Sequence, residues 1–182
     1  MGRRAELRDL VAMQERDRLV SLVGPGGCGK TRLALELVRL IDAPTVWVEL
    51  AATHHEDELA TPFLDALGER DYPGREPLDQ VVDAIERLDR DRPQGDPSAG
   101  TDEHTLLVVD NAEHLVEAVA HLVDHLLARV SELRVVVTTR EPLGITGESV
   151  YRVPPMGHED RDGRRPGRHE GDAVDLFVDR AS

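Results

Sequence analysis

The sequence is poor in cysteine, in aromatic residues and in long hydrophobic runs. Cys28 is the single cysteine among 182 residues, which excludes an internal disulfide and zinc clusters built on several thiolates. The longest apolar runs, such as LLVV at 106–109, are far shorter than the roughly 18 residues that a membrane span needs. The first ten residues, MGRRAELRDL, lack the apolar segment of a secretory leader. These absences favour a protein of the reducing cytoplasm.

Positive charge is scarce as well. The chain has 22 basic and 36 acidic side chains, and its formal net charge is -14. A surface this acidic repels a phosphate backbone, so we expect no direct binding of DNA or RNA by these residues. The length corresponds to one compact domain over residues 1–182, which is large enough to bury a core without a disulfide or a metal.

Lysine and asparagine each occur once, as Lys30 and Asn111, while the other Lys/Arg positions are all arginine. The simplest explanation is a coding bias that replaces lysine by arginine and removes asparagine. Under such a bias, the two remaining residues are candidates for chemistry that arginine cannot perform. An ammonium is a compact point charge, whereas a guanidinium is a broad plane.

Apolar runs alternate with amphipathic patterns along the chain. We expect strands at 19–23, 45–50, 105–110, 133–139 and 149–154, and helices at 4–14, 31–41, 56–68, 78–90, 112–130 and 173–181. Two polar stretches, 91–104 and 157–172, are expected to be flexible loops. Because the strands are continuous apolar runs, the pattern predicts a three-layer α/β fold. Its mostly parallel, five-stranded sheet would carry helices on both faces.

A glycine-rich turn between the first strand and the next helix is the strongest signal. Residues 24–31, GPGGCGKT, match the phosphate-binding pattern G-x-x-x-x-G-K-[ST] of P-loop NTPases in the required strand–turn–helix context. Glycines let backbone N–H groups surround an anion, and the helix start adds its positive end. We expect Lys30 to reach the β and γ phosphates of a nucleotide and Thr31 to bind Mg²⁺. The alternative is a structural turn with an incidental lysine.

Acidic residues follow the third strand. Asp110 ends that strand, where a carboxylate can hold the Mg²⁺ shell beside the phosphate loop; the alternative is a helix N-cap. A second acid at position 111 would activate water, but Asn111 stands there. Glu113 could reach the γ-phosphate side, or could simply be an acid favoured near a helix N-terminus. Slow turnover is therefore expected.

Arg140 ends the fourth strand, at the sheet edge that carries the phosphate loop if all strands are parallel. Its guanidinium could contact a γ-phosphate and report whether ATP or ADP is bound, and the alternative is an ion pair with Glu141. Cys28 is interpreted as a tolerated small residue and not a redox switch, because no second cysteine could resolve it. Three histidines share one helical stripe that is interpreted as a solvated face and not a zinc site. They are His114, His121 and His125.

Six blocks together resemble a known family. They are GRRAEL, RLVSLVGPGGCGKTRLALEL, VWVELA, LLVVDNAEHL, LRVVVTTREPLGITGESVYRVPP and AVDLFVDRA. In combination they are similar to the NB-ARC-like ATPase domain of bacterial STAND regulators, which are signal-transduction ATPases found in LuxR-type and SARP-type transcriptional activators. The resemblance implies a switch in which ADP holds the resting form and ATP opens it.

The resemblance also assigns roles to single positions. Lys30 and Thr31 match the Walker A pair, Asp110 the Walker B acid and Arg140 the sensor arginine, while Arg3 lies in the segment that packs near adenine. The resemblance thus implies catalytic roles for Lys30, Asp110 and Arg140, and Glu113 joins the predicted catalytic set from its position alone. Mg²⁺ would be held by Thr31 and Asp110. The implied nucleotide-binding set is Arg3, Gly24, Pro25, Gly26, Gly27, Cys28, Gly29, Lys30, Thr31 and Arg32.

Compared with this family, the chain stops before the Gly-x-Pro segment and the winged-helix lid, which is expected of a truncated core or a fragment. The implied partners are ATP or ADP, effector or sensor domains of a longer regulator, and further copies of the chain in a nucleotide-dependent assembly. Two other functions are considered. One is a degenerate nucleotide-binding module without turnover, and the other is a small-molecule kinase, which the absence of an Arg-rich helical lid disfavours.

Overall fold

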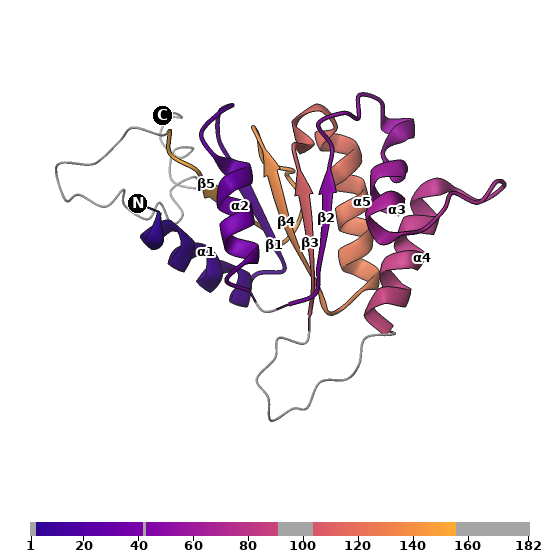
Figure 1. Cartoon of the computed structure of the whole chain (residues 1–182), viewed down its shortest axis with the longest axis horizontal. Helices are drawn as coiled ribbons and strands as arrows, with labels where there is room; N and C mark the ends of the chain where they lie inside the picture. The colour runs from indigo at the N-terminus through magenta and orange to yellow at the C-terminus, as the bar shows by residue number, and fades with distance from the viewer. Residues whose placement is uncertain (1–2, 42, 91–103, 156–182) are drawn as a thin grey trace, which may run out of the picture.

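The computed structural model describes residues 3–41, 43–90 and 104–155. They form a five-stranded sheet with the order β2-β3-β4-β1-β5, in which every paired strand is parallel. The strands are β1 (Leu19–Val23), β2 (Thr45–Glu49), β3 (Thr105–Asp110), β4 (Leu133–Thr139) and β5 (Glu148–Arg152). All strands therefore point their carboxyl ends to the same edge, as the arrowheads in Figure 1 show.

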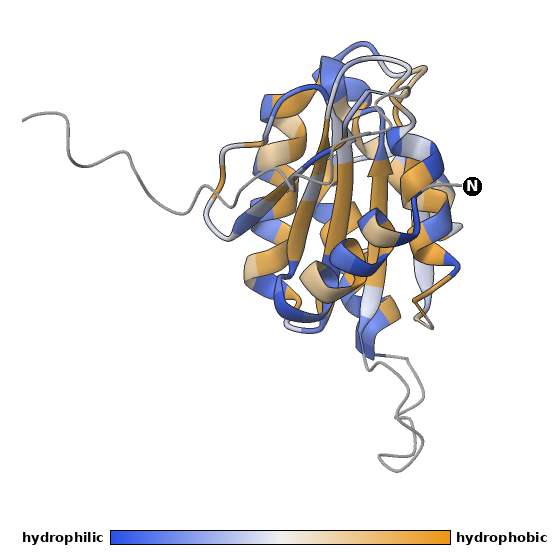
Figure 2. Ribbon diagram, turned by 90° about the vertical axis from the view of Figure 1, so that its left-hand side faces the viewer, coloured by the Kyte–Doolittle hydropathy of each residue, from blue (hydrophilic) through white to orange (hydrophobic). Residues whose placement is uncertain are grey.

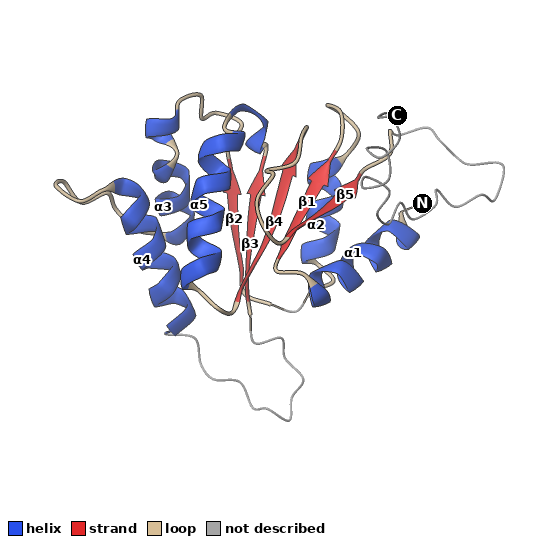
Figure 3. Cartoon of the chain, turned by 180° about the vertical axis from the view of Figure 1, so that it is seen from behind, coloured by secondary structure: helices blue, strands red, loops and turns tan. Residues whose placement is uncertain are grey.

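Helices cover both faces of the sheet. One layer consists of α1 (Arg4–Arg16) and α2 (Lys30–Val38), and the other of α3 (Ala60–Leu67), α4 (Pro77–Arg90) and α5 (Val116–Arg129). Figures 1 and 3 show the two layers from opposite sides, with the sheet between them. The prediction of a three-layer α/β fold with a parallel sheet is confirmed.

The central strands are buried on both faces because their side chains alternate between two cores. On β3, Leu106 and Val108 pack into the cluster under α1 and α2, whereas Leu107 and Val109 pack into the cluster under α3, α4 and α5. Every residue of β1 and β3 is buried. This explains why these strands are continuous apolar runs, which Figure 2 shows as hydrophobic bands through the sheet.

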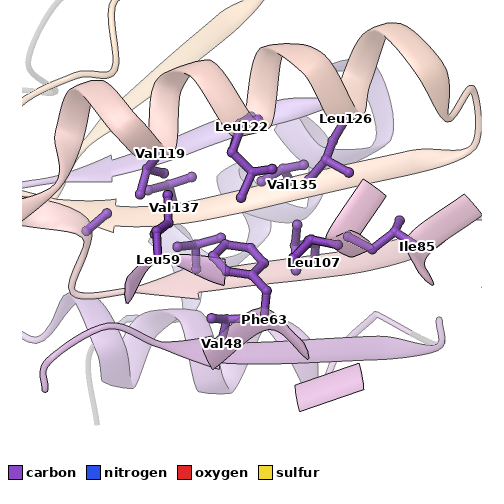
Figure 4. Packing of buried hydrophobic residues seen from close by; sticks show 14 of the residues in the cluster. Val48, Leu59, Phe63, Ile85, Leu107, Val119, Leu122, Leu126, Val135 and Val137 are labelled. Atoms are coloured by element: carbon purple, nitrogen blue, oxygen red, sulfur yellow. The ribbon is translucent and has the colours of Figure 1, made fainter. Parts of the chain in front are cut away.

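The larger core surrounds Phe63 of α3, which is fully buried. In Figure 4 its ring lies among side chains from the sheet and from α5, including Val48 and Leu107. Burying side chains of this size stabilises the fold by roughly 1.5–3 kcal/mol each. This core fixes β2 and β3, and so positions the residues at their carboxyl ends.

Several expected boundaries differ from the observed ones. The helix expected at 56–68 begins with a separate 3-10 turn, Glu56–Glu58, and α3 ends where Gly68 adopts a left-handed φ of 70°. A second 3-10 turn, Ala112–His114, precedes α5. The helix expected at 31–41 ends at Val38. The expected loop at 157–172, the closing helix at 173–181 and nearly all of the loop at 91–104 lie outside the described residues. No described helix is long and apolar enough to cross a membrane.

Candidate nucleotide-binding site

The phosphate loop, residues 24–31, forms a tight turn at the carboxyl edge of the sheet. The N–H of Cys28 donates to the carbonyl of Pro25 at 3.3 Å, which closes the turn before α2 begins at Lys30. Gly27 and Gly29 have φ angles of 74° and 87°, which a residue with a Cβ adopts only under strain. A Cβ on Gly24 would lie 2.9 Å from the Cys28 sulfur. Gly27 and Gly29 are therefore required by the backbone path, and Gly24 by the close approach of Cys28.

Lys30 lies folded back against the beginning of the loop. Its side chain is largely buried, and its ammonium donates to the carbonyls of Gly24 at 2.8 Å and Pro25 at 3.2 Å. Two neutral carbonyls compensate a buried positive charge less well than an anion would. The loop therefore presents a cation beside the positive end of α2, which is the arrangement that attracts a phosphate group.

Asp110 connects the phosphate loop to the centre of the sheet. The Thr31 hydroxyl donates to its Oδ1 at 3.0 Å, and the Thr138 hydroxyl donates to the same oxygen. The Thr138 oxygen in turn accepts the backbone N–H of Asn111 at 3.0 Å. Residues from the loop and from the ends of β3 and β4 thus meet at one fully buried carboxylate.

The second oxygen of the same carboxylate forms no such hydrogen bond. Oδ2 of Asp110 is buried and has no hydrogen-bond partner among the described residues. Asp110 does not cap the following turn, because the residue before that turn is Asn111 and no side chain caps it. An unpartnered carboxylate oxygen beside the Thr31 hydroxyl is the donor set that Mg²⁺ prefers, directly or through its water ligands. The residues present therefore fit a magnesium ion.

Asn111 has an unusual conformation and an unexpected partner. Its φ of 61° is the single positive value among the described non-glycine residues. Its side-chain amide donates to Oε1 of Glu49 at 2.9 Å. Glu49 ends β2 directly beside Asp110 in the sheet register. Sequence reasoning missed Glu49, although its place at the carboxyl end of a parallel strand was a usable signal.

Arg140 and Glu113 form an ion pair next to the phosphate loop. Nη2 of Arg140 lies 2.6 Å from Oε1 of Glu113, so the alternative pairing with Glu141 is not what the structure has. A Cβ on Gly26 would lie 3.6 Å from the same Nη2. The guanidinium therefore lies close to the loop at Gly26.

Arg3 contacts the loop from the opposite direction. Its guanidinium donates to the carbonyl of Cys28 at 2.7 Å and to that of Gly29 at 3.4 Å, and it pairs with Glu6 at 3.3 Å. These contacts tie the N-terminal residues to the loop, and the contact near adenine that the resemblance implies for Arg3 stays a prediction. Arg32 is exposed on the first turn of α2.

The histidine stripe of α5 and its preceding turn is exposed at all three positions, His114, His121 and His125. Among the described residues no group of three or more potential ligands could hold a metal ion. The exposure of the three side chains agrees with the interpretation of this stripe as a solvated face. Cys28 is buried in the loop, packed against the backbone of its first glycine.

Comparison with known proteins adds three findings. A family model described as AAA domain matches residues 13–143. An uncharacterised protein of Mycobacterium tuberculosis is 34% identical over 185 residues, which cover all of this chain and 40% of that protein. Another protein of M. tuberculosis, provisionally named an HTH-type transcriptional regulator, is 36% identical over 173 residues, or 94% of this chain and 17% of that protein. The chain thus spans less than half the length of either relative.

Among solved structures, Cdc6p from Pyrobaculum aerophilum has a similar fold. Its TM-score is 0.55 at 19% sequence identity, and the match covers 84% of this chain and 45% of that one. At this level of identity the likeness concerns the fold alone.

Proposed function

The chain belongs to the AAA domain family, and from this premise we propose that it is the nucleotide-binding core of a signal-transduction ATPase. It binds ATP or ADP with Mg²⁺, hydrolyses ATP slowly, and couples the presence of the γ-phosphate to its conformation. The resemblance to STAND regulators and the relative provisionally named a transcriptional regulator support a role in transcriptional control.

The observation that carries this proposal is the contact between Thr31 and Asp110. It joins the phosphate loop to the acidic end of β3 through a 3.0 Å hydrogen bond. A glycine-rich turn that served only the fold would need no buried acid at its threonine, because burying a carboxylate with an unpartnered oxygen is costly. A bound magnesium ion recovers that cost.

Each residue of the site has a role in this proposal. The loop N–H groups and the Lys30 ammonium bind the phosphates, and Thr31 and Asp110 hold the metal. The Mg²⁺ ion, when bound, neutralises charge on the phosphate oxygens. Arg140, which lies close to the loop at Gly26, donates to the γ-phosphate and so distinguishes ATP from ADP.

Slow hydrolysis follows from the residue beside Asp110. Asn111 cannot act as a base, and its amide is bonded to Glu49. The same observation favours a second candidate function, a nucleotide-binding interaction module that has lost turnover. The two functions share the binding site and differ in whether phosphate is released.

Native mass spectrometry of the gently purified chain, followed by a phosphate-release assay, tests these functions. Bound ADP or ATP together with slow phosphate release supports the signalling ATPase. Bound nucleotide without release above the no-protein control supports the interaction module. If the purified chain carries no nucleotide and calorimetry detects no binding of added ADP or ATP, both functions are contradicted.

The partners we propose are other domains of a longer regulator and further copies of the same chain. The relatives are much longer than this segment, which leaves room for sensor and effector domains outside it. The formal charge of -14 supports the view that other parts of such a regulator contact DNA. We also propose that the segment acts in the cytoplasm, which its single cysteine supports.

A further inference from the structure

One nitrogen of Arg140 lies close to both the Glu113 carboxylate and the phosphate loop. Nη2 lies 2.6 Å from Oε1 of Glu113, and a Cβ on Gly26 of the phosphate loop would lie 3.6 Å from the same atom. This nitrogen is therefore within reach of both the carboxylate and an anion seated on the loop, and the more highly charged of the two would hold it more strongly. The ion pair therefore competes with the nucleotide for one donor.

We propose that Glu113 is a positioning residue that holds Arg140 in the nucleotide-free state, and that Arg140 passes from Glu113 to the γ-phosphate when ATP binds. This inference rests on the proposed function, because it requires a nucleotide in the loop. It adds a specific partner for the arginine in the resting state. ADP lacks the phosphate that would take the arginine, so the ion pair persists in the ADP state.

The burial of the two partners suits such a transfer. The Arg140 side chain is 61% exposed and can move, whereas the Glu113 side chain is only 12% exposed and is held between β3 and α5. An ion pair with one exposed partner is weak, so a phosphate with more charge can replace the carboxylate. A second basic group, Nε2 of His114, lies 4.0 Å from the same oxygen of Glu113. Glu113 thus keeps a polar neighbour after Arg140 leaves.

The transfer also determines selectivity between nucleotides. ATP must break the ion pair when it binds, and this cost lowers its affinity, whereas ADP leaves the pair intact and its affinity is unaffected. Loss of the Glu113 charge should therefore improve binding of a triphosphate alone. If Glu113 instead activated water, its replacement would lower turnover without changing nucleotide affinity, so the two roles give different results.

The test is calorimetric titration of the 182-residue chain with ADP and with the hydrolysis-resistant ATP analogue AMPPNP, both with Mg²⁺. We expect Glu113→Gln to bind AMPPNP about fivefold more tightly, which corresponds to about 1 kcal/mol, with ADP affinity unchanged. The matched control is Glu141→Gln, which removes the same charge from the residue beside Arg140. This control variant should leave the ratio of AMPPNP to ADP affinity unchanged.

A double-mutant cycle completes the test. Arg140→Ala should weaken AMPPNP binding, and adding Glu113→Gln to it should have no further effect on the nucleotide preference. The inference is wrong if Glu113→Gln leaves the ratio of AMPPNP to ADP affinity as in the wild type, or if its effect persists without Arg140. Failure of the wild-type chain to bind either nucleotide would instead overturn the proposed function.

Discussion

The hydroxyl of Thr31 donates a 3.0 Å hydrogen bond to Oδ1 of Asp110, a residue 79 positions further along the chain. Thr138 donates to the same oxygen from the neighbouring strand. Both hydroxyl protons are thereby directed at one carboxylate oxygen, and Oδ2 remains buried without a partner among the described residues. One oxygen of Asp110 thus serves the fold, and the other is left for the metal that we propose.

Asp110→Asn should preserve binding of ATP but remove its dependence on Mg²⁺. The amide oxygen can still accept from the Thr31 and Thr138 hydroxyls, so the fold is retained, whereas the charge that attracts the cation is lost. Affinity for the metal should fall by at least about 10-fold, because even groups that only orient a metal ligand contribute that much. Calorimetric titration with and without Mg²⁺ measures this, with Asp124→Asn on the exposed face of α5 as the control. Unchanged metal dependence would refute the role of Asp110.

Lys30→Ala should abolish most nucleotide binding while the chain remains folded. The ammonium contacts only the loop carbonyls in the absence of a ligand, so its loss leaves the cores intact. Removing a buried, hydrogen-bonded charge from a binding site costs roughly 2–5 kcal/mol, or at least about 30-fold in affinity. Circular dichroism checks the fold and calorimetry the affinity. Arg39→Ala, beyond the end of α2, removes one exposed cation and should bind normally.

Arg18→Ala should lower stability without touching the nucleotide site. The Arg18 guanidinium donates to the carbonyls of Leu127 and Leu133 at 3.0 and 3.1 Å, and also to that of Val130. It thus satisfies carbonyls at the end of α5 and at the start of β4, and its loss should cost about 2 kcal/mol.

Urea denaturation measures the effect, and Arg18→Lys should rescue it poorly because one ammonium cannot reach three carbonyls in a fixed plane. The control is Arg16→Ala, which breaks an exposed ion pair with Asp17. Its unfolding free energy should change by less than about 1 kcal/mol. Equal effects of the two alanine variants would show that Arg18 does not cap α5.

Tyr151 should make the protein less stable at high pH. Burial, followed by the nearby charges of Glu6 and Asp9, raises the pKa of Tyr151 to about 12 from its usual value of 10.0. Below pH 10 the tyrosine is protonated in both states, so its full contribution to stability is present. Between about pH 10 and 12 the unfolded chain loses the proton and the folded chain keeps it, so the free energy of unfolding falls as the pH rises.

Urea midpoints measured from pH 8 to 12 test this, with Tyr151→Phe as the comparison. The variant should lose less stability across the alkaline range than the wild type, because phenylalanine has no proton to release. Parallel curves for the two proteins would show that Tyr151 does not contribute.

The sequence by itself determined the layers, the strands and the phosphate loop. Apolar runs in β1, β3 and β4 indicate burial on both faces of the sheet. The glycines of residues 24–31 predict a turn whose positive φ angles only glycine adopts easily. These features are encoded by residues close together in the chain. The ends of the helices were less accurate, because packing decides where α2 stops and where α3 begins.

Only the tertiary structure decided which polar residues meet at the carboxyl edge of the sheet. The strand order places β3 between β2 and β4, so Asp110 contacts Thr138, and Asn111 contacts Glu49 as well as Thr138. Arg140 pairs with Glu113 across the edge and not with its chain neighbour Glu141. Such pairs depend on which strands lie side by side, and spacing along the chain does not record that.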